Sequence, residues 1–338
     1  MDAITIRRPD DWHLHLRDGA MLRAVAPSSA AFGRVVVMPN LVPPVVTGAD
    51  ARAYRERVRA AGVARPLMTL YLTEGTDPAD VVAAHRARDA FAVKLYPAGA
   101  TTNSASGVRD WRAVRPVLAA MEEAGVPLCV HGEVTDGDVD VFDREAAFLD
   151  RVMAPLLAAH PRLKVTLEHV TTREAVDFVR AHPGMGATIT VQHLMMDRND
   201  LFAGGLRPHN YCLPVLKRRT HREALVAAAT SGPGPFFLGT DSAPHPVHAK
   251  EAACCAAGCF TAPVALPCLA QAFDEAGRLG ALEAFASLNG PAHYGLEPNE
   301  DTITLERRDV TDWPAEVGAD PVVTVWHPGR AVAWAVVP

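Results

Sequence analysis

The amino-acid sequence predicts an α/β protein, a (β/α)8 TIM-type barrel with a C-terminal extension. Short apolar, β-branched runs alternate with longer amphipathic stretches, which is typical of βαβ units and a parallel sheet. About eight such strand–helix units can be counted, the number that a closed barrel needs. Several apolar runs also end in His, Lys or Asp, and the carboxyl ends of barrel strands form the rim that carries catalytic residues. No glycine-rich dinucleotide fingerprint follows any strand, which disfavours a Rossmann fold.

The first half of the chain establishes this alternation. Strands are expected at 4–8, 11–16, 34–40, 65–72, 91–96 and 126–133. Helices are expected at 49–62, 76–89, 109–125 and 143–160. Thr76 or Asp77 can cap the second of these helices, which has Pro78 in its first turn. Pro116 marks either a shifted start or a kink in the third.

The second half continues in the same way. Strands are expected at 163–170, 186–194 and 235–244, and helices at 171–182, 219–232, 262–277 and 279–290. A long, loop-rich segment at 195–216 interrupts the alternation. Because no internal repeat or Pro- or Ser-rich linker divides the chain, residues 1–338 are predicted to form a single domain. Within it, 300–338 form a peripheral C-terminal extension of extended structure that covers part of the barrel.

Composition excludes several classes of function. The chain has 338 residues, enough for one large barrel, and a net charge of −6 without a basic stripe, so nucleic acid is not an expected partner. No apolar run reaches the roughly 18 residues of a membrane span, and none near the N-terminus suits a secretion signal. The sequence therefore predicts a cytoplasmic protein that contacts neither nucleic acid nor membrane.

The cysteines leave one alternative open. Cys254, Cys255 and Cys259 are clustered, which suggests a structural zinc site, but no second pair at zinc-finger spacing accompanies them. Reduced, mostly buried thiols are the favoured interpretation, since a chain of this length does not need disulfides to fold.

His13 and His15 form the most conspicuous local pattern. Two residues apart on a strand, both side chains point the same way, so two imidazoles on one face can bind one divalent ion. Alone, the pattern equally fits two unrelated polar residues on an exposed strand. His131, His169 and Asp241 each end an apolar run of their own, so all should reach the same rim. A lone histidine there is usually structural, and Asp241 alone could cap a turn, but together they favour a metal site.

Lys94 is out of character at the end of a buried strand, because lysine is almost never fully buried without a partner. An ammonium group has no lone pair and cannot ligate a metal. If Lys94 belongs to the site, it is either neutral or converted by carbon dioxide into a carbamate, which would act as a bridging carboxylate. Four His, one Asp and a modified Lys exceed the ligands of a single catalytic zinc and suit two metals, with Asp241 as the nearby base.

Seven segments of the chain closely resemble the dihydroorotase family of the single-polypeptide bacterial and fungal type, within the amidohydrolase superfamily. The segments are RPDDWHLHLRDG, VVVMPN, VKLYPAGATTNS, VHGEVTD, EHVTT, RPHNYCLP and LGTDSAPH. They occur in the family's order, and the resemblance runs from about residue 6 to about residue 294.

The resemblance implies a metal centre and a reaction. His13 and His15 would bind one Zn²⁺ with Asp241, His131 and His169 the second, and N-carboxylated Lys94 would bridge the two. A hydroxide between the metals would attack the ring carbonyl of (S)-dihydroorotate, with Asp241 as general acid and base. The reverse reaction closes N-carbamoyl-L-aspartate into the ring with loss of water, in de novo pyrimidine biosynthesis. A homodimer is also implied.

The same resemblance implies the substrate contacts. Arg17, Asn40 and His245 would hold the substrate carboxylate, to which the planar fork of Arg is well suited. Main-chain groups near Leu213 and Ala257 would meet the polar edge of the ring, beside His131. Segment 98–107 would be a lid whose residues Thr101 and Thr102 close over the substrate. On residue type alone, Arg17 could pair with Asp18, Asn40 could be a turn residue and the lid an ordinary loop.

Two alternatives remain. A hydantoinase- or allantoinase-like cyclic amidohydrolase would share the metal ligands but lack the trio of Arg17, Asn40 and His245. A non-catalytic barrel acting as a scaffold would be expected to have lost some of the six ligands.

Overall fold

Eight parallel strands form the central sheet of the computed structural model, which describes residues 2–309 and 312–337. Each strand pairs with the next along the chain. The strands are β2 (Asp11–Leu14), β3 (Val35–Val37), β4 (Pro66–Tyr71), β5 (Ala92–Leu95), β6 (Leu128–His131), β7 (Val165–Glu168), β8 (Gly186–Ile189) and β9 (Phe236–Leu238). The predicted parallel α/β barrel is confirmed.

The barrel closes just beyond β9, where the chain meets β2. The Asp241 amide donates to the His13 carbonyl at 2.8 Å, and the His15 amide donates to the Ser242 carbonyl at 2.9 Å. Asp11 reinforces the junction, because its carboxylate accepts the amide of Thr240 at 2.8 Å and the Thr240 hydroxyl at 2.6 Å. Closure therefore brings two segments more than 200 residues apart into register at the rim.

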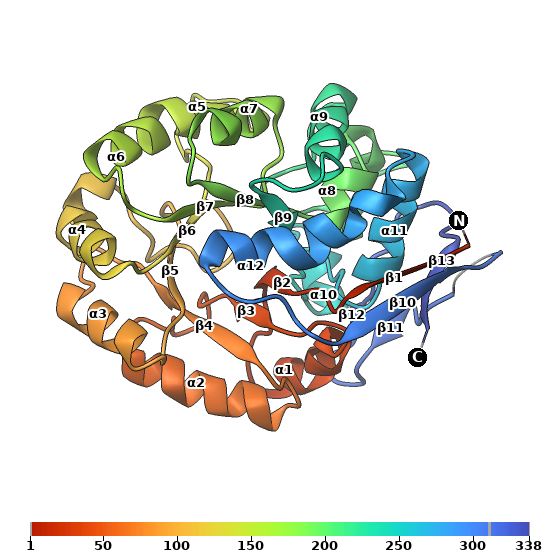
Figure 1. Ribbon diagram of the computed structural model, residues 1–338, viewed down its shortest axis with the longest axis horizontal. Helices are drawn as coiled ribbons and strands as arrows, with labels where there is room; N and C mark the ends of the chain where they lie inside the picture. Colours follow the sequence, from red (N-terminus) through yellow and green to blue (C-terminus); the bar gives the residue numbers. More distant parts are fainter. Residues whose placement is uncertain (1, 310–311, 338) are drawn as a thin grey trace.

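Helices surround the strands (Figure 1). They are α1 (Gly19–Val25), α2 (Gly48–Ala60), α3 (Pro78–Arg86), α4 (Arg115–Ala124), α5 (Arg144–Phe148), α6 (Ala154–Ala159), α7 (Arg173–Ala181), α8 (Val191–Met195), α9 (Arg219–Ala229), α10 (Val247–Lys250), α11 (Ala265–Glu275) and α12 (Asn289–Tyr294). In Figure 1, α12 crosses in front of the strands, and it contacts β9. One continuous apolar cluster runs from the barrel into the C-terminal segment.

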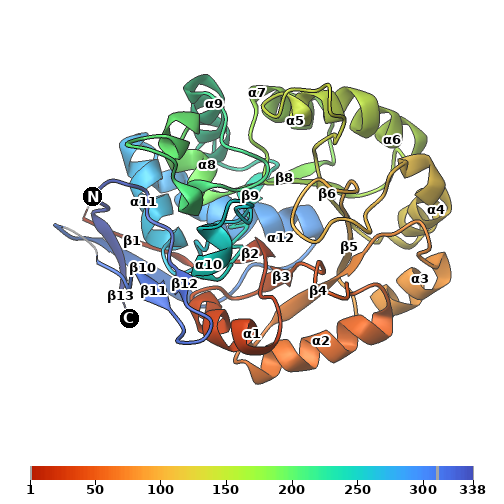
Figure 2. The ribbon, with the colours of Figure 1, turned by 180° about the vertical axis from the view of Figure 1, so that it is seen from behind.

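The C-terminal extension forms extended structure beside the barrel, as the sequence predicts. An antiparallel sheet joins β1 (Ala3–Arg7), β10 (Thr302–Arg307) and β13 (Trp334–Val337), and β11 (Glu316–Val317) pairs with β12 (Val323–Thr324). Both termini lie at this side of the molecule, also when it is seen from behind (Figure 2). Residues 310, 311 and 338 of the extension lie outside the described part, and the single-domain assignment stays a prediction.

Three predicted elements differ in detail. The expected helix at 143–160 is interrupted by a π-helical turn at Leu149–Met153 between α5 and α6. The expected strand at 186–194 ends at Ile189, because the Thr190 hydroxyl accepts the His193 amide and starts α8. The expected helix at 279–290 divides into a 3-10 turn, a π-helical turn at Ala284–Leu288 and α12.

Two open questions about helix starts are also resolved. Asp77, rather than Thr76, caps α3, because its carboxylate accepts the Ala79 amide at 2.9 Å. Pro116 marks a shifted start: a 3-10 turn at Trp111–Val114 precedes α4, which begins one residue before the proline. Among the described residues, every helix is too short or too polar to cross a bilayer.

Buried histidines predict a loss of stability in acid. Burial lowers the pKa of His193 to about 4, from about 6.5 in an unfolded chain. Since the unfolded chain binds more protons between these values, stability should fall as pH drops through that window. Metal-free protein should lose about 2 kcal/mol more of its unfolding free energy between pH 7 and pH 5 than its His193→Gln variant. Urea denaturation measures this, and equal losses would contradict it.

Candidate metal centre and active site

The six predicted ligands all reach the carboxyl-terminal rim of the barrel. β2 carries His13, with His15 just beyond it, β5 carries Lys94, β6 ends in His131, and His169 and Asp241 follow β7 and β9. All six are buried. The structure brings these side chains together; their role as metal ligands stays a prediction.

The backbone at two of these positions is unusual. His169 and Asp241 have positive φ angles of 41° and 45°, and the nearby Arg17 has 59°. A non-glycine residue pays about 1–2 kcal/mol for the left-handed conformation. The surrounding structure therefore holds these residues in an unfavourable backbone conformation. Such strained residues cluster at functional sites.

His13, His15 and Asp241 form the tightest group. Their potential ligand atoms lie within 4.8 Å of one another, and this is the one such group of three found in residues 2–309 and 312–337. Asp241 Oδ1 lies 3.3 Å from His13 Nε2 and 3.1 Å from His15 Nε2. Two imidazole nitrogens and a carboxylate oxygen facing one point are a donor set suited to a divalent first-row metal.

Partners behind the rings fix which nitrogen faces the centre. Glu168 Oε2 lies 2.8 Å from His13 Nδ1, so that nitrogen donates to it, and Nε2 faces Asp241 Oδ1 and His15 Nε2, each at 3.3 Å. Asn40 Oδ1 accepts from His15 Nδ1 at 2.8 Å, and Glu133 Oε2 accepts from His131 Nε2 at 2.8 Å. Sequence reasoning missed both glutamates. The available signals were that Glu168 directly precedes His169 and that Glu133 lies two residues after His131.

Protonation states differ within this group. Burial and Lys94 lower the pKa of His13, but the carboxylates of Glu168 and Asp241 outweigh them and leave it above its usual value. Burial lowers the pKa of His15 to about 4, which keeps its ring neutral. Burial alone would raise the pKa of Asp241, but the neighbouring rings of His13 and His15 outweigh it and hold that pKa well below its usual range. Neutral imidazole and ionised carboxylate are the protonation states that ligate metals.

Lys94 and His169, two further predicted ligands, have side-chain atoms without hydrogen-bond partners among the described residues. These atoms are Lys94 Nζ and His169 Nδ1, and both are buried. Lys94 is fully buried, and its Nζ lies 5.2 Å from the centre of the Tyr96 ring. Burial lowers its pKa, which favours the neutral amine. Orphaned donors of this kind, beside the group of His13, His15 and Asp241, fit a centre that holds further metal-bound groups.

His13, His15 and Asp241 line a cavity at this rim. Arg17 also lines it, with part of its guanidinium unpaired. Its Nε donates to the Pro244 carbonyl at 3.1 Å and its Nη2 lies 3.1 Å from His245 Nε2. Its Nη1 is buried with no partner in the described part of the chain. Leu213 and Ala257 line the cavity beside Arg17. The cavity is thus lined both by a cluster of imidazoles and by a guanidinium with one unpaired nitrogen.

The comparisons with known proteins decide the family. The amidohydrolase family matches residues 10–305. A dihydroorotase of Ruegeria pomeroyi is 65% identical, with 99% of each chain covered. The chain belongs to the dihydroorotases of the amidohydrolase family. It is an enzyme of that family, as the sequence predicts.

Two solved dihydroorotases have the same fold over nearly their full lengths. The dihydroorotase of Saccharomyces cerevisiae, solved in complex with 5-fluoroorotic acid, is 33% identical with a TM-score of 0.91, covering 99% of this chain and 98% of that one. The dihydroorotase of Campylobacter jejuni is 37% identical with a TM-score of 0.90, covering 99% and 97%.

The lid segment expected from the dihydroorotase resemblance lies over the cavity. Thr101 and Thr102 both line it. The Thr102 hydroxyl donates to the Ala257 carbonyl at 3.2 Å, and the Thr102 carbonyl accepts from Asn40 Nδ2 at 3.0 Å. Asn40 therefore connects His15 to the lid, a contact that residue type alone did not suggest.

His245 supports the cavity from behind. Its Nε2 lies 2.9 Å from the Ala257 carbonyl as well as 3.1 Å from Arg17 Nη2. Burial lowers its pKa to about 3, so the ring is neutral. With its one proton on Nε2, the ring can donate a hydrogen bond to the Ala257 carbonyl. The six cysteines of this dihydroorotase chain are free thiols, four of them buried, with Cys254 exposed and Cys255 half-buried.

Proposed function

We propose that this dihydroorotase interconverts N-carbamoyl-L-aspartate and (S)-dihydroorotate plus water, a step of de novo pyrimidine biosynthesis. The observation that carries the proposal is that one small cavity holds both the group of His13, His15 and Asp241 and the free edge of Arg17. A metal centre suits attack at an amide carbonyl, and a guanidinium suits the carboxylate of the substrate. The ligand bound to the S. cerevisiae dihydroorotase, 5-fluoroorotic acid, is also a ring carboxylic acid.

We propose that the cofactor is two Zn²⁺ ions. His13, His15 and Asp241 would hold one, His131 and His169 the other, and Lys94, carboxylated on Nζ, would bridge them. When bound, the ions lower the pKa of water and polarise the substrate carbonyl. The support is the chemistry of the donors: a neutral imidazole at His15, an ionised carboxylate at Asp241 and a buried amine at Lys94 without a partner among the described residues.

The side chains around this centre would position the substrate and transfer a proton during the reaction. Arg17 would pair with the carboxylate, with Asn40 and His245 beside it, while the main chain at Leu213 and Ala257 meets the ring. Asp241 would take a proton from the attacking hydroxide and deliver it to the leaving amide nitrogen, as general base and then general acid. The lid would exclude water from the closed cavity.

Substrate preference tests the reaction. Purified protein reconstituted with zinc should hydrolyse dihydroorotate far faster than hydantoin. The opposite preference would favour a hydantoinase-like enzyme. Less than one zinc per chain, with no turnover after zinc is restored, would favour a non-catalytic scaffold.

Replacing Arg17 tests carboxylate recognition. Arg17→Met should lower kcat/KM for dihydroorotate by roughly 10²-fold, since losing one partner of a buried charge pair costs about 2–5 kcal/mol. Most of the loss should appear in KM. Steady-state kinetics measure it, with Arg57→Met, an exposed arginine paired with Asp18, as the matched control. Unchanged kcat and KM would place the carboxylate elsewhere.

We further propose a cytoplasmic homodimer that needs no nucleic acid or membrane partner. The net charge of −6 and the absence of a basic stripe support the exclusion of nucleic acid. Light scattering at micromolar concentration would test the dimer.

A further inference from the structure

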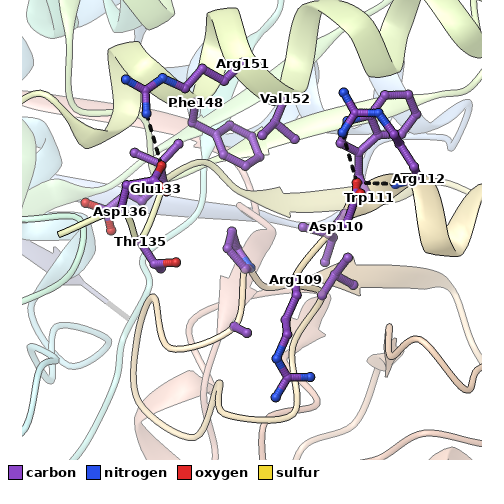
Figure 3. A pocket seen from close by; sticks show the side chains of 15 residues that line it. Arg109, Asp110, Trp111, Arg112, Glu133, Thr135, Asp136, Phe148, Arg151 and Val152 are labelled. Carbon is purple, nitrogen blue, oxygen red and sulfur yellow. Dashed lines mark hydrogen bonds and ion pairs between the residues drawn. The ribbon is translucent and has the colours of Figure 1, made fainter. Parts of the chain in front are cut away.

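A second cavity, of about 580 Å³, lies beside the active site. Glu133, which orients His131, belongs to its wall, and so do Pro97, Ala98 and Val108 at the two ends of the lid segment. Figure 3 shows Arg151 with Asp136 on one side, Arg112 with Asp110 and Trp111 on the other, and Phe148 and Val152 between them. The proposed reaction uses none of these groups except Glu133.

Two residues that line this cavity each have a buried polar atom without a partner among the described residues. Glu133 is 1% exposed, and while its Oε2 accepts from His131, its Oε1 has no partner among the described residues. Trp111 is 8% exposed, and its indole Nε1 also has none there. A buried polar atom without a hydrogen bond costs about 1–3 kcal/mol, so each calls for an explanation. A ligand that offers an N–H to Glu133 and an acceptor to Trp111 would satisfy both.

Three arginines line the cavity, together with the carboxylates of Glu133, Asp110 and Asp136. The guanidinium of Arg109 makes no hydrogen bond or ion pair with the described residues. Arg112 pairs with Asp110 at 3.2 Å and Arg151 with Asp136 at 3.1 Å, and all four of these side chains are more than half exposed. Exposed pairs contribute about 0–1 kcal/mol, so a ligand carboxylate can replace or share them at little cost. The π-helical turn at Leu149–Met153 places Arg151 and Val152 in this wall.

We propose that this cavity is a second binding site for the open-chain acid, N-carbamoyl-L-aspartate. The inference rests on the proposed function for the identity of the acid. That molecule carries two carboxylates, for the arginines on the two sides of the cavity, and a ureido group whose N–H donors suit Glu133. Dihydroorotate carries a single carboxylate, so the site would favour the open chain over the ring. Succinate carries two carboxylates but no N–H donor, so it tests the role of Glu133.

A ligand in the second cavity would affect the active site through Glu133 and the lid segment. The same carboxylate of Glu133 would accept from the ligand through Oε1 and from His131 through Oε2. The ligand would also contact the base of the lid, where the Val108 amide donates to the Tyr96 carbonyl at 2.8 Å and the Ala98 amide to the Val108 carbonyl at 3.1 Å. Binding of the open-chain acid in this cavity would therefore change the surroundings of His131 and of the lid segment as the concentration of the acid rises.

Calorimetric titration of the zinc-loaded, full-length Asp241→Asn variant with N-carbamoyl-L-aspartate tests the proposal. Two classes of site per chain are expected. Adding Arg109→Met should weaken the second class about tenfold or more, because a charged hydrogen bond is lost, and leave the first unchanged. Arg115→Met is the matched control, an exposed arginine six residues on that does not line the cavity, and should leave both classes intact. Trp111→Phe should also weaken the second class.

The first class shows that each variant is folded. A single class in Asp241→Asn, or a second class that Arg109→Met leaves unchanged, would overturn the second site while leaving the proposed function standing. Equal binding of dihydroorotate at the second class would overturn its selectivity, and equal binding of succinate would overturn the role of Glu133. If neither class binds, the proposed function falls too.

Discussion

Asp241→Asn should reduce turnover in both directions by about 10²–10⁴-fold, the usual contribution of a general acid or base. Asparagine keeps an oxygen where Oδ1 faces His13 and His15, so the metal should be retained. What is lost is the ability to take up a proton and release it. Initial rates with dihydroorotate and with N-carbamoyl-L-aspartate, together with zinc content by atomic absorption, measure the two effects separately.

Asp11→Asn is the matched control for that experiment. Asp11 is a buried carboxylate too, but it faces the Thr240 amide and hydroxyl at the barrel closure and does not line the cavity. Burial raises its pKa to about 7, so the neutral form is already present at neutral pH. The variant should keep most of its turnover. Near-wild-type rates in Asp241→Asn would refute the proton-transfer role.

Topology explains why so much of the rim could be predicted from sequence. Parallel strands in a closed barrel all end on the same side. A ligand-type residue at the end of each apolar run therefore lies at the carboxyl-terminal rim. His131 and His169 are 38 positions apart, yet their ring centres lie 4.7 Å apart because β6 and β7 are neighbours. The two histidines could be predicted to lie close together because each occupies the same position in its strand–helix unit.

Contacts that do not follow from a repeated position could not be predicted. Glu168 reaches His13 across 155 residues, and its place directly before His169 does not say which histidine it contacts. Thr190 looks like a strand residue because it is β-branched, but its hydroxyl starts α8 instead. The substrate contact of Asn40 stays a prediction, but the link that its amide makes between His15 and the lid segment does not follow from the sequence. Such contacts depend on how segments meet in space.

Lys94→Met should abolish most activity while leaving the fold as stable as before or more stable. An unmodified, fully buried amine without a partner costs desolvation energy, so an apolar side chain of similar length should be tolerated in metal-free protein. If carboxylated Lys94 bridges two ions, its loss should lower zinc content to one ion per chain or fewer. Loss of the bridge would remove several kcal/mol of transition-state stabilisation, about 10³-fold or more in rate.

Lys250 shows why the expected result is specific to Lys94. It is also buried, but its Nζ donates to the carbonyls of Tyr211, Ala256 and Gly258 at 2.9, 2.7 and 2.8 Å. Lys250→Met should therefore leave three acceptors unpaired and lower the melting temperature of the metal-free protein, as Lys94→Met should not. Thermal denaturation of both variants after chelation, beside zinc content before it, separates the two roles. Full zinc content and full activity in Lys94→Met would show that this lysine is a structural residue after all.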